Sequence, residues 1–397
     1  LSDDVDDPVA KLQRRIDEGE TSLDFDQKWG YLDSTLKLLK IPVSSQTLVF
    51  SKTSLQYRKI SPSTPRAIYF NDDVYVGWIP EADLLEISSF DPNQGAIFYQ
   101  IEQKTMEEPA LLRATIDCTQ CHVARETRNI PGALLRSIVA TPTGSQAPRS
   151  AAFVTGHESP WEQRFGGWYI TGTHGSRSHM GNHVFTRKGE NPQSRAGVDE
   201  PINLSEKVPL DRYLSPHSDI VAHLVLAHQT QMHNLITLVN FKTRIAVHAD
   251  RKAGRPAELG LSDASRKQIE GLVEELLRYL LFADEAKLDG PVAGSSTFAG
   301  EFTSLGPRDS KGRSLRDFDL NRRLFRNPCS YLIYTKAFDA LPDPAKQHLY
   351  RRLREVLTSE TPDDGFEKLS LEDRRSILEI LIETKSGLPD DWRRPAP

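Results

Sequence analysis

Cysteines and long apolar segments are both scarce in this sequence. The 397 residues include three cysteines, too few for the disulfide framework that stabilises small secreted domains. No apolar stretch approaches the roughly 20 residues that a membrane-spanning helix needs, so we expect no membrane span in this chain. With 38% hydrophobic residues at this length, the chain can build a core large enough to enclose a cofactor.

An excess of positive charge is also missing. There are 50 Lys and Arg residues against 55 Asp and Glu, which gives a net charge of -5, and the basic residues are scattered along the chain. Nucleic-acid-binding proteins usually concentrate basic residues on one face, so we expect no nucleic-acid partner. The chain begins with Leu rather than Met. We interpret this as a processed start, from which any export signal would already have been removed.

The strongest positive signal is a five-residue motif, Cys118-Thr119-Gln120-Cys121-His122. Two thiols three positions apart can each form a thioether bond to one of the two vinyl groups of haem. The histidine directly after the second cysteine can then bind the haem iron. With so few cysteines in the chain, this spacing rarely arises by chance. We therefore predict one covalently attached haem c, because the sequence contains no second motif of this kind.

Two other cysteine chemistries fit this segment less well. A thioredoxin-like redox pair would need a buried strand before the motif, and residues 111–117 do not form a convincing one. A zinc site would need a further pair of ligands, whereas Cys329 stands alone in its segment. We expect Cys329 to be a small buried core residue, and a reactive role for its thiol stays open.

The segment from Cys118 to His122 resembles the haem-attachment motif of c-type cytochromes, and that resemblance implies His122 as the proximal iron ligand. The chain differs from the better-known members of that family. It is much longer than the small electron carriers, it has one motif where di-haem peroxidases have two, and its motif lies far from the C-terminus, unlike that of cytochromes c′. The segments 69–78 and 328–334 resemble those of large single-haem bacterial proteins.

The pattern of apolar residues predicts an α+β fold in three regions, which could form one composite domain. Region 1–105 has two short helices followed by β-type runs separated by turn residues, which predicts an antiparallel sheet. Region 106–250 is the predicted haem c-binding region, with long loops and a long helix, and region 251–397 is predicted to be helical. The expected elements are helices near 8–18 and 31–39, strands near 47–50, 67–70, 74–79, 84–87 and 96–101, a helix over 218–240, and helices starting at Ser262 and at a Ser370/Asp373 capping box.

The second axial ligand of the iron decides the chemistry, because a strong protein ligand favours electron transfer whereas an open position permits catalysis. Ten of the 11 histidines lie in region 106–250. On the predicted helix 218–240, His228 lies on the apolar stripe and would face the core or the haem, and His233 lies on a flank. A lone buried histidine is more often a hydrogen-bonded core residue. A haem in the same chain makes His228 a candidate metal ligand, and both histidines candidate acid/base groups. Met180 is the methionine alternative.

The Gly-rich segment 166–175 is a third candidate for contact with the haem. Its glycines beside Trp168 and His174 would let the backbone approach a flat cofactor closely, although a turn with a core tryptophan explains the same residues. His179 and His183 lie four positions apart and could share a helix face. A glycine between them weakens that interpretation, so we do not expect a second metal.

Arginines in the same region could bind the haem propionates, because a planar guanidinium group matches a carboxylate. Each one could equally be an ordinary surface charge. Arg125 follows the motif most closely. The candidates are Arg125, Arg128, Arg136, Arg164 and Arg177.

Together these observations predict an exported haem c-containing oxidoreductase that acts on peroxide, oxygen or a small redox substrate. Its distal side would be lined by histidines, with His228, His233 and His174 as catalytic candidates. The alternative is an electron-transfer protein with a six-coordinate haem, and a haem-based sensor or assembly subunit is a third possibility. The length of the chain favours the enzyme. Haem c is attached after export, so we expect a periplasmic or otherwise exported protein, whose partner is a redox protein or a small-molecule substrate.

Overall fold

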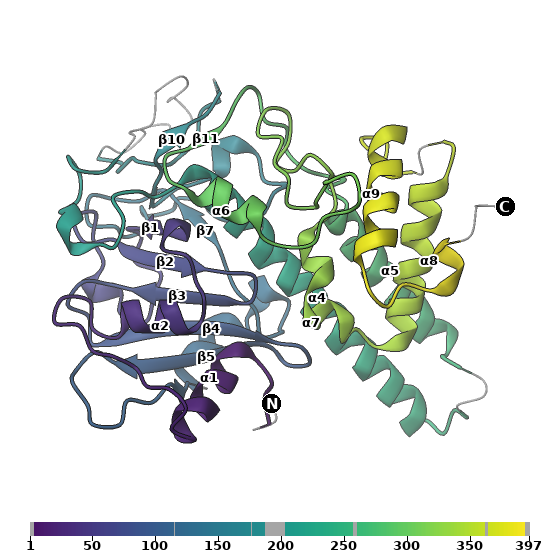
Figure 1. Cartoon of the computed structure of the whole chain (residues 1–397), viewed down its shortest axis with the longest axis horizontal. Helices are drawn as coiled ribbons and strands as arrows, with labels where there is room; N and C mark the ends of the chain where they lie inside the picture. Colours follow the sequence, from purple (N-terminus) through teal and green to yellow (C-terminus); the bar gives the residue numbers. More distant parts are fainter. Residues whose placement is uncertain are drawn as a thin grey trace.

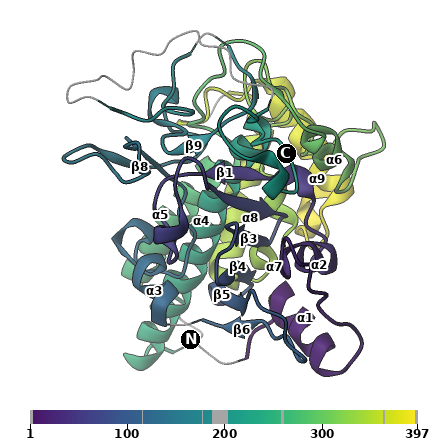
Figure 2. The ribbon, with the colours of Figure 1, turned by 90° about the vertical axis from the view of Figure 1, so that its left-hand side faces the viewer.

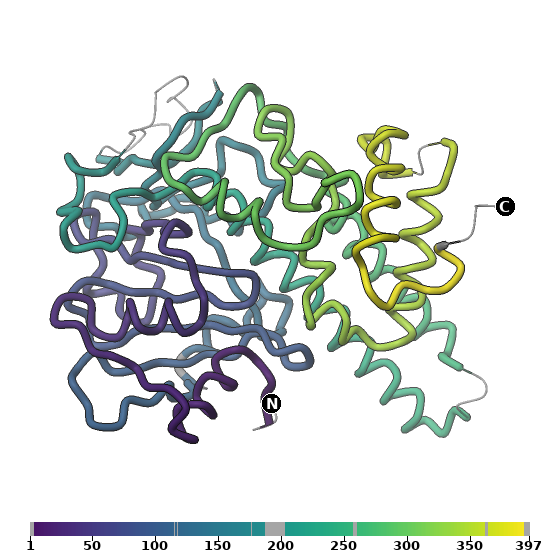
Figure 3. Tube along the Cα trace, in the orientation of Figure 1, coloured from purple at the N-terminus to yellow at the C-terminus, as the bar shows by residue number. Residues whose placement is uncertain are grey.

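The computed structural model describes residues 4–114, 116–175, 177–186, 203–256, 260–361 and 364–393. The N-terminal part of the chain forms a sheet and the C-terminal part forms helices, with helix α4 between them (Figures 1 and 3). The fold is therefore α+β, as the sequence predicts.

A seven-stranded antiparallel sheet dominates the N-terminal part, in the order β6-β5-β4-β3-β2-β1-β9. Its strands alternate side chains between two faces, so each face can pack against a different layer. Short turns join β2 to β5 in sequence; in the first, the Asn71 side chain accepts hydrogen bonds from the N–H groups of Asp73 and Val74. The strands are β1 (Thr47–Val49), β2 (Arg66–Phe70), β3 (Val74–Trp78), β4 (Leu84–Asp91), β5 (Gly95–Glu102), β6 (Leu112–Arg113) and β9 (Trp168–Tyr169).

The first face of the sheet packs against two short N-terminal helices. Helix α1 (Pro8–Asp17) begins after Asp7, whose carboxylate accepts hydrogen bonds from the N–H groups of Val9 and Ala10, as an N-cap does. Helix α2 (Leu32–Leu38) follows. The apolar residues of both helices and of this face form one core.

Helix α4 (Ile220–Lys252) crosses the second face of the sheet. Asp219 fixes its start: one carboxylate oxygen accepts hydrogen bonds from the N–H groups of Val221 (2.8 Å) and Ala222 (3.1 Å). The other oxygen accepts from the N–H group and the hydroxyl of Ser296. Nearly every residue of α4 from 220 to 240 is buried, which explains the dense apolar sequence of this segment.

The C-terminal helices pack beyond α4. Helix α5 (Asp263–Leu280) lies against α4, α8 (Asp343–Thr358) against α5, and α9 (Leu371–Thr384) against α8. Ser262 caps α5 and Ser370 forms the capping box of α9, which confirms both predicted helix starts. The smaller elements are α3 (Ile116–His122), α6 (Phe298–Ser304), α7 (Lys336–Asp339), the pair β7 (Arg136–Ile138) and β8 (Ala152–Val154), and the pair β10 (Gly172–Thr173) and β11 (Ala293–Gly294).

The elements predicted from the sequence are present, with differences at their ends. The five β-type runs between 47 and 101 are β1 to β5, and the two N-terminal helices are α1 and α2. Helix α4 continues to Lys252, whereas the predicted helix ends near 240. The prediction is too short because the last turns of the helix are partly exposed and lack the apolar pattern. The core around α4 contains residues from all three predicted regions. Within the described ranges, no helix is both long and apolar enough to cross a membrane.

Replacing Asp219 with Ala should lower the free energy of unfolding by roughly 2–4 kcal/mol, because buried N–H groups at the start of α4 lose their acceptor and Ser296 loses its partner. Urea unfolding followed by circular dichroism measures the loss. The control is Asp263→Ala, since Asp263 is exposed at the start of α5 and its removal should cost no more than about 0.5 kcal/mol. Equal losses in the two variants would contradict the capping role of Asp219.

Candidate functional site

Helix α3 carries both cysteines and the histidine of the motif within seven residues. Cys121 is exposed, Cys118 packs partly against the core around α4, and His122 is half-buried at the end of the helix. Ile116, at the start of α3, is 73% exposed. Figure 2 shows α3 beside α4 and α5, near the edge of the sheet formed by β5 and β6. The motif therefore lies at the surface, next to the second face of the sheet.

A backbone hydrogen bond orients the imidazole of His122. Its Nδ1 lies 2.8 Å from the carbonyl oxygen of Gly132 and donates to it, and its ring packs against Phe98, with ring centroids 4.7 Å apart. Burial lowers the pKa of His122; the hydrogen bond to Gly132 opposes this, and the charges of Arg66 and Arg136 add to the lowering. The neutral ring has no hydrogen-bond partner at Nε2 among the described residues. This nitrogen can therefore bind a metal ion.

The loop that contains Gly132 is held between α4 and the sheet. The amide side chain of Asn234 accepts from the N–H group of Ala133 (2.9 Å) and donates to its carbonyl (2.7 Å). The N–H group of Ala96 in β5 donates to the carbonyl of Pro131 (3.2 Å). A Cβ atom on Gly132 would collide with the Asn234 amide oxygen, so this close approach needs glycine. Support of this kind around a hydrogen-bonded imidazole is typical of metal-binding histidines.

Beside α3, part of the second face of the sheet is not covered by α4. One row of paired residues crosses the strands here, which we call the open row: Ile68, Gly77, Glu86, Gln100 and Leu112. Its members other than the glycine are at least partly exposed, and Leu112 is 60% exposed. In the neighbouring row, Phe70, Tyr75 and Phe98 are buried. The helices therefore bury the row that contains Phe70 and Phe98 and leave the open row partly exposed.

An arginine lies across the open row. Arg66 pairs with Glu86, and the two side chains are 19% and 17% exposed. Gly77 leaves room for this guanidinium group, because a Cβ atom there would collide with it. Glu86 also accepts hydrogen bonds from Ser54 (2.8 Å) and Gln56 (3.1 Å). The Nε of Arg66 is buried without a hydrogen-bond partner in the described part of the chain, so one donor of the guanidinium group is unsatisfied.

Of the predicted propionate ligands, Arg136 is the one whose charge acts on His122. It lies half-buried in β7, opposite Val154 of β8, and pairs with no acidic residue in the described ranges. Trp168 donates its indole N–H to the carbonyl of Arg136 at 2.8 Å. The indole is buried and packs edge-on against His223. Trp168 therefore holds the strand that carries Arg136. Its burial agrees with the alternative prediction that Trp168 is a core residue.

The other four predicted arginines have different surroundings. Arg125 is exposed in the short 3-10 helix that follows the motif. Two are tied to acidic residues: Arg128 to Glu275 of α5 (2.6 Å) and Arg177 to Asp289 (2.5 Å). The fourth, Arg164, is buried and donates to the backbone carbonyls of His157 and Ser159.

Both ring nitrogens of His228 are engaged in the core. Its Nδ1 lies 2.8 Å from Nδ1 of His157, and its Nε2 lies 2.8 Å from the hydroxyl of Ser330. His233 donates from Nε2 to the carbonyl of Asp72 (2.7 Å). Burial lowers the pKa of His228 to about 3 and that of His233 to about 4. For both residues the structure shows the arrangement of hydrogen-bonded core histidines.

A separate cluster of rings surrounds His174. This ring lies 4.7 Å from that of His179 and 5.9 Å from that of Trp161. Phe165 joins His179 to His223, with ring centroids 5.1 Å and 4.8 Å away. Burial lowers the pKa of His223 to about 3. Among the residues that the structure describes, no group of three or more potential ligands is arranged to hold a metal ion.

Two further sequence candidates lie near this cluster. Met180 is buried, its N–H group donates to the carbonyl of Arg164, and its sulfur lies 3.9 Å from the Ser137 hydroxyl. His183 packs edge-on against Phe185, with ring centroids 4.4 Å apart. His179 accepts at Nδ1 from the N–H group of Gly181. His179 and His183 lie outside any helix, so they do not share the helix face that their spacing suggests.

The ring contacts of the predicted catalytic residues His228 and His233 are made with groups other than His122. His223 and Asn234 are 11 residues apart on α4, about 16 Å along its axis. His223 packs against Trp168 of β9, whereas Asn234 supports the loop beside β5, and four strands separate β9 from β5. His228 precedes Asn234 by six residues, which places it about 9 Å away along the axis and about 120° around the helix. Helix α4 thus extends across the width of the sheet, and its histidines pack against different residues.

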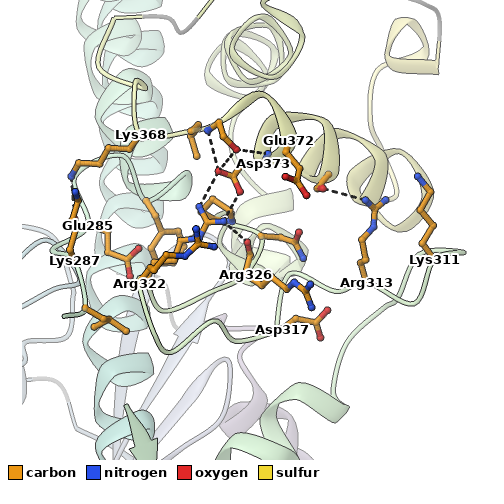
Figure 4. A pocket seen from close by; sticks show the side chains of 18 of the residues that line it. Glu285, Lys287, Lys311, Arg313, Asp317, Arg322, Arg326, Lys368, Glu372 and Asp373 are labelled. Atoms are coloured by element: carbon orange, nitrogen blue, oxygen red, sulfur yellow. Dashed lines mark hydrogen bonds and ion pairs between the residues drawn. The ribbon is translucent and has the colours of Figure 1, made fainter. Parts of the chain in front are cut away.

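A polar hollow in the C-terminal part is lined by both basic and acidic side chains (Figure 4). Arg323 binds Asp373 through two hydrogen bonds of 2.5 Å and 3.1 Å. Lys311 and Arg313 both pair with Glu379 of α9. These cations are therefore neutralised by neighbouring carboxylates. We interpret the pairs as contacts that join α9 to residues 305–330, the segment that follows α6.

The buried histidines predict how stability depends on pH. The pKa values of His223, His228 and His233 are lowered by burial to about 3, 3 and 4, while an unfolded histidine has a pKa near ~6.5. Between these values the unfolded chain binds protons that the folded chain does not. The three histidines should therefore lower the free energy of unfolding as the pH drops below ~6.5, by up to ~1.4 kcal/mol per pH unit for each histidine. Burial raises the pKa of Glu285 to about 7 and that of Asp73 to about 6, and these two groups act in the opposite direction.

Urea titrations between pH 7.5 and 4.5 measure this slope. His233→Gln keeps a donor for the Asp72 carbonyl and should give a shallower slope than the wild type. His248→Gln changes an exposed histidine of the same helix and should leave the slope unchanged. A wild-type slope that His233→Gln does not reduce would contradict the burial argument.

Comparison with protein-family models, with curated proteins and with solved structures finds no match to this chain. No known activity can therefore be carried over from a relative. The functional argument depends on the chemistry of the motif and of the residues around it.

Proposed function

We propose that this protein is a haem c-containing oxidoreductase, with one haem bound covalently through Cys118 and Cys121 and with His122 as an iron ligand. The observation that carries this proposal is the hydrogen bond from Nδ1 of His122 to the carbonyl of Gly132. It selects the tautomer whose Nε2 can bind iron and fixes the direction of the ring.

The residues around the motif fit a covalent haem better than the two rival cysteine chemistries. Cys121 is exposed, so a vinyl group can reach its thiol from the solvent side. The two cysteines occupy the third and sixth positions of α3, whereas a redox-active pair is usually activated at a helix N-terminus. A tetrahedral zinc site needs four ligands, and the described residues contain no such group.

A covalently bound haem would supply one-electron redox chemistry and a site for small ligands. The chain itself holds the haem by two thioether bonds and positions the imidazole. The Gly132 carbonyl strengthens the donor character of His122, because a hydrogen bond at Nδ1 raises electron density on Nε2. Asn234 and Ala96 keep that carbonyl in place from α4 and from the sheet.

We favour an enzyme that acts on peroxide, oxygen or a small redox substrate over a six-coordinate electron carrier. Two observations support this choice. Hydrogen bonds in the core occupy both ring nitrogens of His228 and the Nε2 of His233. The side chain of Met180 is buried beside Ser137. A strong second protein ligand is thereby disfavoured. An exported location and a redox partner protein or small-molecule substrate remain part of the proposal, because haem c is attached after export.

The attachment can be tested by producing the chain in cells that export it and attach haem, followed by acid–acetone extraction and a pyridine haemochrome spectrum. One haem per chain should stay with the protein. Cys118→Ala and Cys121→Ala should each lose at least one thioether bond and shift the α band. Cys329→Ala is the matched control, since this buried cysteine lies in the core and its loss should leave attachment intact. Complete extraction of haem from the wild type would contradict the proposal.

The iron ligand is tested by His122→Gly, which removes the imidazole but leaves both cysteines. The ferric absorption spectrum should change, and added imidazole should restore a spectrum close to that of the wild type by entering the space of the lost ring. His348→Gly in α8 serves as the control, because His348 belongs to a different helix layer, and its spectrum should not respond to imidazole. An unchanged spectrum in His122→Gly would show that another residue binds the iron.

A further inference from the structure

Exposed apolar side chains gather around the open row. The described surface has eight large hydrophobic residues with exposed side chains. Five of them belong to segments that border the row: Leu55, Tyr57, Leu112, Ile116 and Val154. Grouped exposed apolar side chains often mark a binding surface, so this patch is a candidate for one.

Four of these side chains are linked to the row or to the motif by neighbouring residues or by the element that carries them. Leu55 lies between Ser54 and Gln56, which both donate to Glu86. Leu112 is the last member of the row and Ile116 lies on α3 with the two cysteines. Val154 pairs with Arg136, and Figure 2 shows α3 and β8 on the same side of the sheet.

The charges beside the patch suit a flat, apolar group with carboxylates. Three charged side chains act on His122: Arg66, Glu86 and Arg136. Glu86 offsets one positive charge, which leaves Arg136 without an acidic partner in the described ranges and leaves an unsatisfied Nε on Arg66. Guanidinium groups bind carboxylates through paired hydrogen bonds. The patch thus combines exposed apolar side chains with one uncompensated cation, Arg136, beside the proposed covalent anchor.

We infer that the haem proposed above lies against the open row, with a propionate bound by Arg136. This inference rests on the proposed covalent attachment at Cys118 and Cys121, which places the haem within reach of α3. Haem has two apolar faces and two carboxylates, which matches the surface found here. Arg136 is a binding residue in this account, and Trp168 is the positioning residue that holds its strand.

The same placement determines what can bind the iron opposite His122. The segments that border the open row are 50–60, the strands β2 to β6, α3, and residues 136–154. Apart from His122, they contain neither histidine nor methionine. A haem in this place would therefore meet no histidine or methionine of these segments opposite His122, which would leave room for a small molecule. Under this inference these segments, and not the predicted histidines, would form the distal side.

Hydroxyl-radical footprinting of the haem-loaded protein and of the haem-free Cys118→Ala/Cys121→Ala variant tests the placement. Leu112, Ile116 and Val154 should be at least several-fold less oxidised when haem is attached. Ile245 and Leu371, which are 58% and 42% exposed, are internal controls and should react equally in both proteins. Attached haem with no protection of the three residues would overturn the placement while leaving the proposed attachment intact. Absence of attached haem in the wild type would instead overturn the proposed function.

Arg136→Gln tests the propionate contact through the reduction potential of the attached haem. Loss of a nearby positive charge should shift the potential to lower values, because that charge favours the reduced iron. Arg149→Gln is the matched control, since Arg149 is exposed in the turn between β7 and β8, where solvent and salt screen its charge. Equal potentials in Arg136→Gln and the wild type would overturn the role of Arg136.

Carbon monoxide tests the open axial position. The reduced wild-type protein should bind it rapidly and give a changed Soret band without displacing a protein ligand. A low-spin spectrum that carbon monoxide leaves unaltered would show that a strong second ligand from the chain occupies the iron, and it would overturn this part of the inference.

Discussion

Helix α4 packs across the second face of the sheet, and its position determines which strand residues are buried and where α3 lies. The helix starts at Asp219 beside β9 and crosses the strands toward β5, so its first 20 residues are buried on nearly all sides. It covers the row that contains Phe70 and Phe98 and leaves the next row open. The border of that cover is where α3 presents the cysteines and His122. A shift of α4 across the sheet would either bury the open row or remove the support that Asn234 gives to Gly132.

The position of α4 also explains why the histidines are dispersed. A helix that spans the sheet carries each histidine to a different neighbourhood: His223 to the rings near β9, His228 to the core beside Ser330, and His233 to the turn at Asp72. Burial favours the neutral form of an imidazole, and buried imidazoles usually form hydrogen bonds. The buried histidines are polar residues of the core, and the proposed chemistry depends on one surface motif.

Much of the fold could be predicted from local pattern. Alternating apolar residues and turn signals identified β1 to β5, and capping residues identified the starts of α5 and α9. The motif could be found because its residues are close together in the sequence, so that recognising it needs no knowledge of the fold. The end of α4 was missed, since its exposed last turns have no apolar stripe.

The surroundings of the motif could not be predicted, because they depend on contacts far apart in the sequence. The sequence placed Trp168 and the Gly-rich segment near the haem, but nothing local shows that the indole holds the Arg136 carbonyl 32 residues away. Arg66 could not be found from the motif, since it reaches the site through the pairing of β2, β3 and β4. A signal was present in the form of Gly77 within an apolar strand, which often marks close approach of another group.

Peptide mapping of the exported protein tests the central claim most directly. Cleavage after Arg113 and Arg125 releases the peptide 114–125, which contains both cysteines and His122. The account predicts that this peptide carries the mass of one haem after denaturation, while the peptide containing Cys329 is unmodified. Recovery of 114–125 at the mass of the bare peptide, from cells that attach haem to other exported proteins, would contradict the account.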